Sequence, residues 1–459
     1  MNKKEVIGIV CVLMICALIA IVGRRLDAAS VTHIYDAEGN EIANIYIEEG
    51  NFVYQCEDNV RSYVGLVLDE LLDIMCSTEH IDKKQAMKKL MHHGLSVVTY
   101  FDQDLNKILN ESYYSVENAA IVNFSSVLCD TKGCVLASVS MSKESDTINY
   151  ASYSTYAASV IKPLSVYGPA LEDGVIDWST RYEDAPISVI TNDYGETTDW
   201  PQNVESYTYE ACTVAEALQR SLNTVAVRVL QDYGVLNSID FLSTKFDINV
   251  DEERSVAEQN GNDEVLGNIG LGYLRSGVTV KDMAAYYQVF ANGGTYQKAR
   301  AIQSISRKNE IYYEDQTTPI QVFSTDTAYI MNRMLKLVVE EDGTAPSAYV
   351  EGYDICGKTG TSQDNADNWF VGMTPEYVCA TWYGGLEEHN YQEHGMAADY
   401  FATVIAQLPH NSSICFPEGE HVVSCTICKK TGKVATASCS ETITGYFNGE
   451  PPKDVCDEH

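Results

Sequence analysis

A serine and a lysine three residues apart give this sequence a candidate nucleophile and its base. In the motif Ser159-x-x-Lys162, a helix that begins near the serine would place the hydroxyl and the amine on one face, within hydrogen-bond reach. Acyl transfer uses such a pair, because a neighbouring base takes the proton of the serine hydroxyl. Pro163 follows, where the first turn of a helix tolerates proline, and N–H groups at that helix start could bind an oxyanion.

The same motif occurs a second time, so its context has to decide between the two copies. Ser140-x-x-Lys143 lies in a polar stretch with no apolar helix after it, and we interpret it as a solvated loop. Ser159 is followed by large apolar residues that can bury one face of a helix, namely Leu164, Val166, Tyr167 and Leu171. This difference favours Ser159 as the nucleophile.

Two further triplets could complete an acyl-transfer site. Ser221-x-Asn223 follows an amphipathic run, residues 214–218, and taken alone it is typical of a helix end. The other triplet consists of Lys358, Thr359 and Gly360, with Thr361 after it. Its glycine lets a ligand approach the strand backbone, and a cation with hydroxyls suits a carboxylate. A second Lys-Thr-Gly, residues 430–432, has no strand before it and is expected to form a surface turn.

The elements that must position these motifs follow from hydrophobic periodicity. Residues 96–140 alternate as strands do, residues 155 to about 345 are dominated by helical spacing, and residues 366–383 return to strand character. Two of the expected helices run from Val214 to Leu230 and from Val280 to Ala291, the second ending at an Asn-Gly-Gly stop. This order predicts an α+β fold with helices packed against an antiparallel sheet.

Charge excludes some classes of partner. The formal net charge is −34, from 31 Lys and Arg against 65 Asp and Glu, so the surface repels nucleic-acid phosphates and gives no polybasic attraction to anionic lipid. With 459 residues, 45% of them hydrophobic, the chain has a globular composition and room for two or three domains. We expect no metal and no organic cofactor, because the acyl-transfer motifs imply none.

Several of the 14 cysteines occur in groups. Cys129 and Cys134 flank a turn between apolar runs, where a cross-strand disulfide is geometrically plausible. Four others crowd the C-terminal end: Cys425, Cys428, Cys439 and Cys456. They could form a set of disulfides, with three possible connectivities, or a zinc site. We favour disulfides, on the expectation that this part of the chain lies outside the cytoplasm.

Residues 6–22 form an apolar run without one polar side chain, with two basic residues on each side. The run is at the short end for crossing a hydrocarbon core of about 30 Å. A cleaved signal peptide is the alternative, but the run is long for one and the following cleavage site is weak. We expect an uncleaved single-pass anchor in the cell membrane, with the catalytic part outside the cytoplasm.

The three triplets together resemble those of the transpeptidase domain of class A penicillin-binding proteins. Other segments are similar to signature blocks of that family: Pro201-Gln202-Asn203, Ala217 to Thr224, Val278 to Gly294 and Asp367 to Pro375. The tail from Cys428 to His459 also resembles the ends of some members, so that the likeness covers about residues 95–459. One departure lies beside the nucleophile, where members often have Pro-Gly-Ser and this chain has Ala157-Ala158-Ser159.

The resemblance implies the penicillin-binding transpeptidase fold, an antiparallel sheet flanked by a helical subdomain, and a layout of five parts. These would be a cytoplasmic tail at 1–5, a transmembrane anchor at 6–23, a juxtamembrane pedestal at 24–95, the transpeptidase domain at 96–409 and a cysteine-containing tail at 410–459. The pedestal is too short for the glycosyltransferase domain typical of class A members. A separate polymerase is therefore expected to make the glycan strands.

The resemblance also implies the reaction and the role of each motif. Ser159 would attack the D-alanyl-D-alanine end of a peptidoglycan stem peptide, with Lys162 as general base after burial and the nearby Lys358 have lowered its pKa. Ser221 would pass a proton to the leaving amine, and Asn223 would orient Lys162 and the substrate amide. The substrate's carboxylate would be held by Lys358, Thr359, Gly360 and Thr361, and the oxyanion by the N–H groups of Ser159 and Thr361.

Penicillin would acylate the same serine, since its ring mimics the D-alanyl-D-alanine end. Two alternatives stay open: a D,D-carboxypeptidase that uses water as acceptor, and a non-catalytic scaffold or sensor that binds wall peptides or β-lactams. A β-lactamase is disfavoured, because the sequence has no Glu-x-x-x-Asn segment of the class A kind between the second and third motifs.

Overall fold

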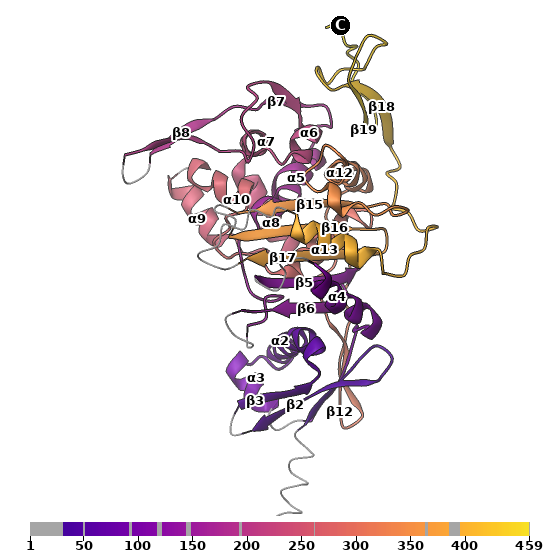
Figure 1. Ribbon diagram of the computed structural model, residues 1–459. Helices are drawn as coiled ribbons and strands as arrows, with labels where there is room; N and C mark the ends of the chain where they lie inside the picture. Colours follow the sequence, from indigo (N-terminus) through magenta and orange to yellow (C-terminus); the bar gives the residue numbers. More distant parts are fainter. Residues whose placement is uncertain are drawn as a thin grey trace, which may run out of the picture. The chain divides into compact units, whose positions relative to one another are not determined.

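The computed structural model describes residues 31–48, 51–90, 94–116, 122–143, 148–191, 195–260, 262–362, 366–384 and 395–458. The chain divides into two units (Figure 1). The first runs to Gln103 and takes in Arg300–Gln316, and the second consists of Asp104–Ala299 and Thr317–His459. The predicted anchor at residues 6–23 lies outside the described residues. Of the helices that are described, none combines the length and the apolar content that a bilayer crossing requires.

The described part of the first unit contains a six-stranded sheet in the order β13-β12-β4-β1-β2-β3. Its strands are β1 (Thr32–Tyr35), β2 (Glu41–Glu48), β3 (Asn51–Cys56), β4 (Ser96–Thr99), β12 (Ile302–Arg307) and β13 (Glu310–Glu314). Helix α2 (Arg61–Glu79) buries Val64, Val67, Leu71 and others at the predicted helical spacing, and α3 (Lys83–Leu90) follows. The Tyr63 hydroxyl donates to the Ala301 carbonyl at 3.2 Å, which ties α2 to the segment that returns from residue 300.

The three motifs lie in the second unit, whose main sheet has five strands in the order β15-β16-β17-β5-β6. They are β5 (Asn123–Asp130), β6 (Val135–Met141), β15 (Cys356–Thr361), β16 (Asp367–Met373) and β17 (Tyr377–Gly384), and all neighbours are antiparallel. β17 pairs with β5 from Tyr377 opposite Asp130 to Gly384 opposite Asn123. Strands from the regions predicted at 96–140 and 366–383 therefore form one sheet, and the predicted α+β fold is confirmed. The expectation of strand character throughout 96–140 is wrong in part, because Ser96–Thr99 belongs to the sheet of the first unit and Gln103–Ser115 forms a helix.

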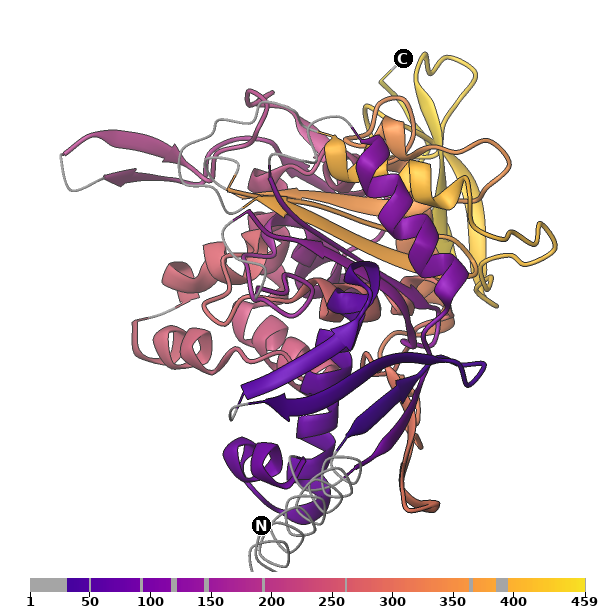
Figure 2. The ribbon, with the colours of Figure 1, turned by 60° about the horizontal axis from the view of Figure 1, so that its bottom comes forward.

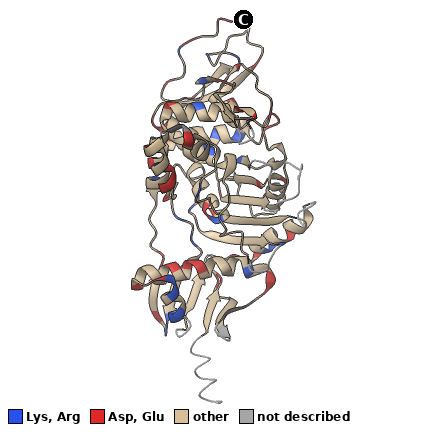
Figure 3. Ribbon diagram, turned by 90° about the vertical axis from the view of Figure 1, so that its left-hand side faces the viewer, with Lys and Arg blue, Asp and Glu red and all other residues tan. Residues whose placement is uncertain are grey.

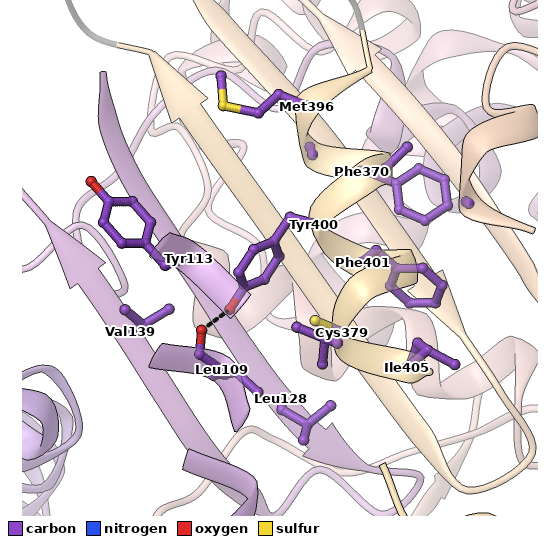
Figure 4. Packing of buried hydrophobic residues seen from close by; sticks show 14 of the residues in the cluster. Leu109, Tyr113, Leu128, Val139, Phe370, Cys379, Met396, Tyr400, Phe401 and Ile405 are labelled. Carbon is purple, nitrogen blue, oxygen red and sulfur yellow. Dashed lines mark hydrogen bonds between the residues drawn. The ribbon is translucent and has the colours of Figure 1, made fainter. Parts of the chain in front are cut away.

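Two helices, α4 (Gln103–Ser115) and α13 (Met396–Ile405), cover one face of this sheet (Figure 2). The Tyr400 ring of α13 packs edge to face on Phe124, with centroids 4.8 Å apart, and its hydroxyl donates to the Leu109 carbonyl of α4 at 2.9 Å (Figure 4). Close-packed aromatic and aliphatic side chains of this kind resist deformation. The sheet therefore offers a rigid support for the motif carried by β15.

The helical block of the second unit differs from the sequence prediction at one place that matters for the site. Its helices are α5 (Gly168–Glu172), α6 (Val214–Gln219), α7 (Asn223–Tyr233), α8 (Val235–Phe246), α9 (Asp251–Asn260), α10 (Leu266–Leu271), α11 (Val280–Tyr286) and α12 (Thr325–Leu337). The single helix expected from Val214 to Leu230 is wrong, because the chain breaks between α6 and α7 at the second motif. The helix expected from Val280 to Ala291 is α-helical only to Tyr286, and a 3-10 turn, Tyr287–Phe290, continues it. The chain then turns at the expected Asn-Gly-Gly stop, with φ of 79° at Gly293 and 92° at Gly294.

The second unit also contains four short pairs of strands among its described residues. They are β7 (Arg181–Glu183) with β10 (Ala211–Thr213), β8 (Ser188–Thr191) with β9 (Thr197–Trp200), β11 (Thr295–Tyr296) with β14 (Ile320–Gln321), and β18 (Val422–Cys428) with β19 (Thr442–Asn448). The last pair forms the C-terminal hairpin. Acidic residues occur on elements of both units, so the negative charge is not confined to one of them (Figure 3).

The cross-strand disulfide that the sequence makes plausible between Cys129 and Cys134 is not formed. Cys129 is a buried thiol at the end of β5. The register of β5 and β6 shifts between Leu128 and Cys129, which places Val135 opposite Cys129. The two cysteines are therefore not directly opposite each other, as a cross-strand bridge would require.

Candidate active site

The candidate nucleophile lies in a helical segment made of three kinds of turn. Ala158–Ile161 forms a 3-10 turn, Pro163–Tyr167 a π-helical turn, and α5 continues from there. Ser159 is partly exposed. The preceding Ala158 has φ of +48°, in the left-handed region that favours glycine, and its N–H donates to the Gly272 carbonyl at 3.2 Å. Non-regular helical turns of this kind are frequent at functional sites.

Lys162 is fully buried, and its amine faces the second motif. It donates to the Ser221 carbonyl at 2.9 Å and to Asn223 Oδ1 at 2.5 Å. Neither of these bonds goes to the Ser159 hydroxyl, so the direct contact expected from the three-residue spacing is not made in this structure. The 3-10 geometry of the turn and the two acceptors across the site determine where the amine lies.

The second motif owes its position to the break between α6 and α7. Ser221 has φ of +58°, which turns the chain so that Asn223 becomes the first residue of α7. The Asn203 side chain accepts the Asn223 N–H at 2.7 Å and thereby satisfies one of the open donors at this helix start. Asn223 Nδ2 donates to the Gln202 carbonyl at 2.6 Å, which leaves its Oδ1 turned to Lys162.

Asp184 is a buried carboxylate that supports the second motif and that sequence reasoning missed. It accepts hydrogen bonds from the Asn203 amide at 2.6 Å, from the Thr224 hydroxyl at 2.7 Å, and from the N–H and hydroxyl of Thr208. Burial raises the pKa of this carboxyl, but these hydrogen bonds outweigh it and the pKa ends below its ordinary value of 3.8. No local sequence signal distinguishes Asp184 from the many other acidic residues of the chain.

The third motif approaches both of the others from the edge of the sheet. Lys358 is fully buried, and its ammonium donates to Ser221 Oγ at 2.8 Å and to the Thr359 carbonyl at 3.0 Å. Gly360 lies against the nucleophile segment, where a Cβ would be 3.1 Å from both the Ala157 carbonyl oxygen and the Val160 nitrogen. The glycine is therefore needed for close approach to the nucleophile turn.

Both threonines of the third motif are partly exposed beside this contact. The Thr359 hydroxyl shares a hydrogen bond of 2.7 Å with the Thr344 hydroxyl, which adds a hydroxyl that sequence reasoning did not find. The Ser362 N–H donates to the Asp367 carbonyl across the sheet. Since successive N–H groups of a strand alternate sides, the Thr361 N–H is directed to the unpaired edge of β15.

The two buried lysines share an environment that favours their neutral forms. Burial lowers the pKa of Lys162 well below its ordinary value of 10.5, and the charge of Lys358 lowers it further. Burial also lowers the pKa of Lys358 to about 7. This is the direction that the sequence analysis predicts for Lys162. An amine that is neutral at physiological pH can accept a proton from a serine hydroxyl.

The second copies of the first and third motifs, Ser140-x-x-Lys143 and residues 430–432, lie outside this site. Ser140 belongs to strand β6 and its hydroxyl accepts the Tyr150 N–H at 2.8 Å, so the predicted solvated loop is wrong, but the residue has no buried lysine partner. Residues 430–432 form a turn with φ of 69° at Gly432, but the expectation of a surface turn with no strand before it is wrong in part, because β18 ends at Cys428 and both Thr431 and Gly432 are buried. The structure thus brings Ser159, Lys162, Ser221, Asn223 and Lys358 into one site and leaves both copies out of it.

Comparisons with known proteins identify two regions of the chain. Residues 124–405 match the penicillin binding protein transpeptidase domain, and residues 419–459 match the C-terminal domain of penicillin-binding protein 1A. The first match covers the five-stranded sheet and the helical block, and the second covers the C-terminal hairpin. The family-like blocks from Pro201 to Pro375 fall within the first region, and the tail from Cys428 to His459 falls within the second.

Curated relatives point the same way. Penicillin-binding protein 1A of Clostridium botulinum strain Langeland is 32% identical over 320 residues, which is 66% of this chain and 38% of the relative. Penicillin-binding protein 4 of Bacillus subtilis is 28% identical over 72% of this chain and 53% of its own length. The chain thus spans between about two fifths and about half of the length of these relatives.

Solved structures share the fold. Penicillin binding protein 3 from Mycobacterium tuberculosis aligns with a TM-score of 0.63 at 20% identity, covering 85% of this chain and 99% of that one. Penicillin-binding protein 1A from Haemophilus influenzae gives a TM-score of 0.58 at 22% identity over 73% of this chain. With the family match over more than half of its residues, the chain belongs to the penicillin-binding protein transpeptidase family.

Proposed function

We propose that this protein is a serine D,D-transpeptidase that cross-links peptidoglycan stem peptides through an acyl-enzyme on Ser159. The observation that carries the proposal is that three motifs distant in the sequence meet around the amines of Lys162 and Lys358. Lys162 binds Ser221 and Asn223, while Lys358 binds Ser221 from the other side. A buried pair of lysines that share one serine has no evident value for stability, since burying a lysine disfavours its charged form. It does suit proton transfer.

In the acylation step, the Ser159 oxygen attacks the carbonyl carbon between the two terminal D-alanines and its proton passes to the neutral Lys162 amine. The amide C–N bond then breaks, and the leaving D-alanine nitrogen takes a proton from the Ser221 hydroxyl. Because Ser221 Oγ already accepts a bond from Lys358, its own hydrogen is available for donation, and Lys358 can restore it. An ester on Ser159 and free D-alanine result.

In the second step, the amine of a neighbouring stem peptide attacks the ester, its proton passes through Ser221 back to Lys358, and Lys162 returns its proton to the Ser159 oxygen as the ester bond breaks. The N–H groups of Ser159 and Thr361 would hold the oxyanion in both steps; removal of one such donor costs about 10²–10³ in rate where it was tested. Lys358, Thr359 and Thr361 would bind the terminal carboxylate, with Gly360 allowing the approach. The partial exposure of both threonines supports this role.

A cellular setting follows from the same proposal. We place the enzyme at the cell membrane, anchored by residues 6–23 with its catalytic domain outside the cytoplasm, where peptidoglycan is found. A separate polymerase would supply the glycan strands. No cofactor is required, because both steps use side chains and backbone groups of the chain itself.

Labelling with a fluorescent penicillin tests the nucleophile. The wild-type chain is expected to form a covalent, denaturation-resistant adduct, and Ser159→Ala to form none. Ser140→Ala is the matched control, because it removes the serine of the second Ser-x-x-Lys copy and is expected to label like wild type. Persistent labelling of Ser159→Ala, or loss of labelling in Ser140→Ala, would refute the assignment.

A turnover assay on a stem-peptide thioester with an added amine acceptor then separates the three candidate activities. Dimeric product supports a transpeptidase. Free tetrapeptide as the dominant product would instead establish a D,D-carboxypeptidase, and acylation without turnover would establish a sensor or scaffold. Ser159→Ala serves as the blank, since none of these products should form without the nucleophile.

A further inference from the structure

Three of the four C-terminal cysteines form a cluster that the proposed reaction does not use. The sulfur atoms of Cys428, Cys439 and Cys456 all lie within 4.8 Å of one another. Cys428 ends β18, Cys439 lies in the loop before β19, and Cys456 lies near the C-terminus. Cys425, three residues before Cys428 on the same strand, does not belong to the cluster, since side chains at that spacing point to opposite faces of a strand.

The arrangement differs from the disulfide set favoured by the sequence analysis. A disulfide needs two sulfurs about 2.05 Å apart and would leave the third thiol of the cluster over. Thiolates that bind zinc at about 2.3 Å in tetrahedral geometry lie roughly 3.8 Å from one another, which a three-sulfur cluster of this size can reach with small shifts. Cys428 and Cys456 are buried, and Cys439 is half-buried. We propose that Cys428, Cys439 and Cys456 bind one structural zinc ion.

Hydrogen-bond donors around the sulfurs fit this assignment. The Thr436 N–H donates to Cys439 Sγ at 3.3 Å. The Thr436 hydroxyl is also in hydrogen-bond contact with Cys439 Sγ, at 3.6 Å. Donors aimed at sulfur stabilise the thiolate, and such outer partners are typical of metal sites. Each thiol gives up its proton when the metal binds, so zinc affinity is expected to fall as the pH is lowered.

A zinc ion would stabilise this C-terminal segment, which is small. A two-stranded hairpin is at best marginally stable alone, and segments of about 40 residues usually need a disulfide or a metal. Few apolar side chains of this region are buried, among them Ile427 and Phe447. The three cysteines come from the first strand, the loop and the C-terminus, so one ion would fasten all three parts together.

The zinc would also fix one wall of a cavity. A cavity of about 880 Å³ lies between this segment and the β7–β10 region, and Lys429 and Lys430, which follow Cys428 directly, line it together with Arg181 and Arg220. Structural zinc sites carry four ligands. The described residues supply three of them, the sulfurs of Cys428, Cys439 and Cys456.

The test measures zinc in the full-length chain, purified in detergent with a reducing agent and dialysed against buffer without chelator. One zinc per chain is expected by elemental mass spectrometry. Cys428→Ser, Cys439→Ser and Cys456→Ser are each expected to weaken zinc binding at least about tenfold. Replacing zinc by cobalt is expected to give the thiolate-to-cobalt charge-transfer absorption, and the three variants to reduce it.

Two matched controls keep the test specific. Cys425→Ser, from the same strand, and Cys415→Ser, an exposed cysteine, are expected to keep full zinc content. Fluorescent penicillin labelling reports whether each variant still folds. The proposal is overturned if the wild-type chain holds no more zinc than a variant in which Cys428, Cys439 and Cys456 are all replaced by serine. It is also overturned if Cys425→Ser loses as much zinc as Cys428→Ser, or if peptide mapping without reductant finds two of the three cysteines joined in a disulfide.

Discussion

The pKa of Lys358 makes the pH dependence of β-lactam acylation a sharp test of the proposed site. In the free protein this pKa is about 7, because the amine is fully buried. The cationic form is proposed to bind the carboxylate that β-lactams share with the stem peptide. By simple titration the cationic fraction falls from about 90% at pH 6 to about 50% at pH 7 and about 10% at pH 8. The second-order acylation constant is expected to fall in proportion.

Lys162 acts in the opposite direction. It must be neutral to take the Ser159 proton, so its lowered pKa sets the acid limb of the profile, and Lys358 sets the alkaline limb. Stopped-flow or gel-based kinetics with a fluorescent penicillin would give the constant at each pH. The expected profile is a bell whose alkaline limb falls about tenfold per pH unit above pH 8.

Lys358→Arg is the matched variant, because a guanidinium stays charged throughout this range. Its profile is expected to lose the alkaline limb, whatever its absolute height. Thermal unfolding at each pH controls for loss of the folded protein. A wild-type constant that stays level or rises from pH 7 to pH 9, or an Arg variant with the same alkaline fall, would contradict the proposed roles.

Three further changes test the parts that support the site. Asp184→Asn leaves buried donors unsatisfied and is expected to cost about 3 kcal/mol in unfolding free energy at neutral pH. Because the pKa of Asp184 in the folded protein lies below 3.8, the difference in stability from wild type should shrink as the pH falls through that lowered value. A stability difference independent of pH would contradict this. Ala158→Gly relieves a left-handed alanine and is expected to change stability by about 0 to +1 kcal/mol in thermal melts, whereas a clear loss would show that the turn is not strained. Gly360→Ala places a Cβ 3.0 Å from Val160 Cγ1. It is expected to slow penicillin acylation roughly tenfold or more and to cost about 1–3 kcal/mol in stability. An unchanged acylation rate would mean that the close approach of Gly360 to the nucleophile turn does not matter.

The order of the three motifs and the change from strand to helix to strand could be predicted from the sequence alone. Both depend on interactions between residues close along the chain, such as the apolar residues after Ser159 that mark a helix face. The choice of Ser159 over Ser140 rests on the same local pattern. Helix starts at Thr213 and Thr279 also follow from local chemistry, because each hydroxyl accepts an N–H three residues later.

Other features exist only because distant segments pack together. The break at Ser221 interrupts a sequence that is helical on both sides, and it forms where Lys162 donates to the Ser221 carbonyl and Asn203 accepts the Asn223 N–H. The amine of Lys162 turns to Ser221 and Asn223, whereas local spacing directs it to Ser159. Hydrogen bonds between residues so far apart in the sequence form because folding buries both partners together. A local sequence pattern does not indicate which distant residues will be buried side by side.

The sequence by itself determined which residues carry the chemistry and in which kind of element each motif lies, since periodicity and turn chemistry act over a few residues. The tertiary structure alone decided that a carboxylate at 184 supports the second motif, that residues 300–316 join the first unit, and that three of four terminal cysteines meet. The physical reason is the same in each case: packing and desolvation select partners across the whole chain, and they become visible only once the chain has folded.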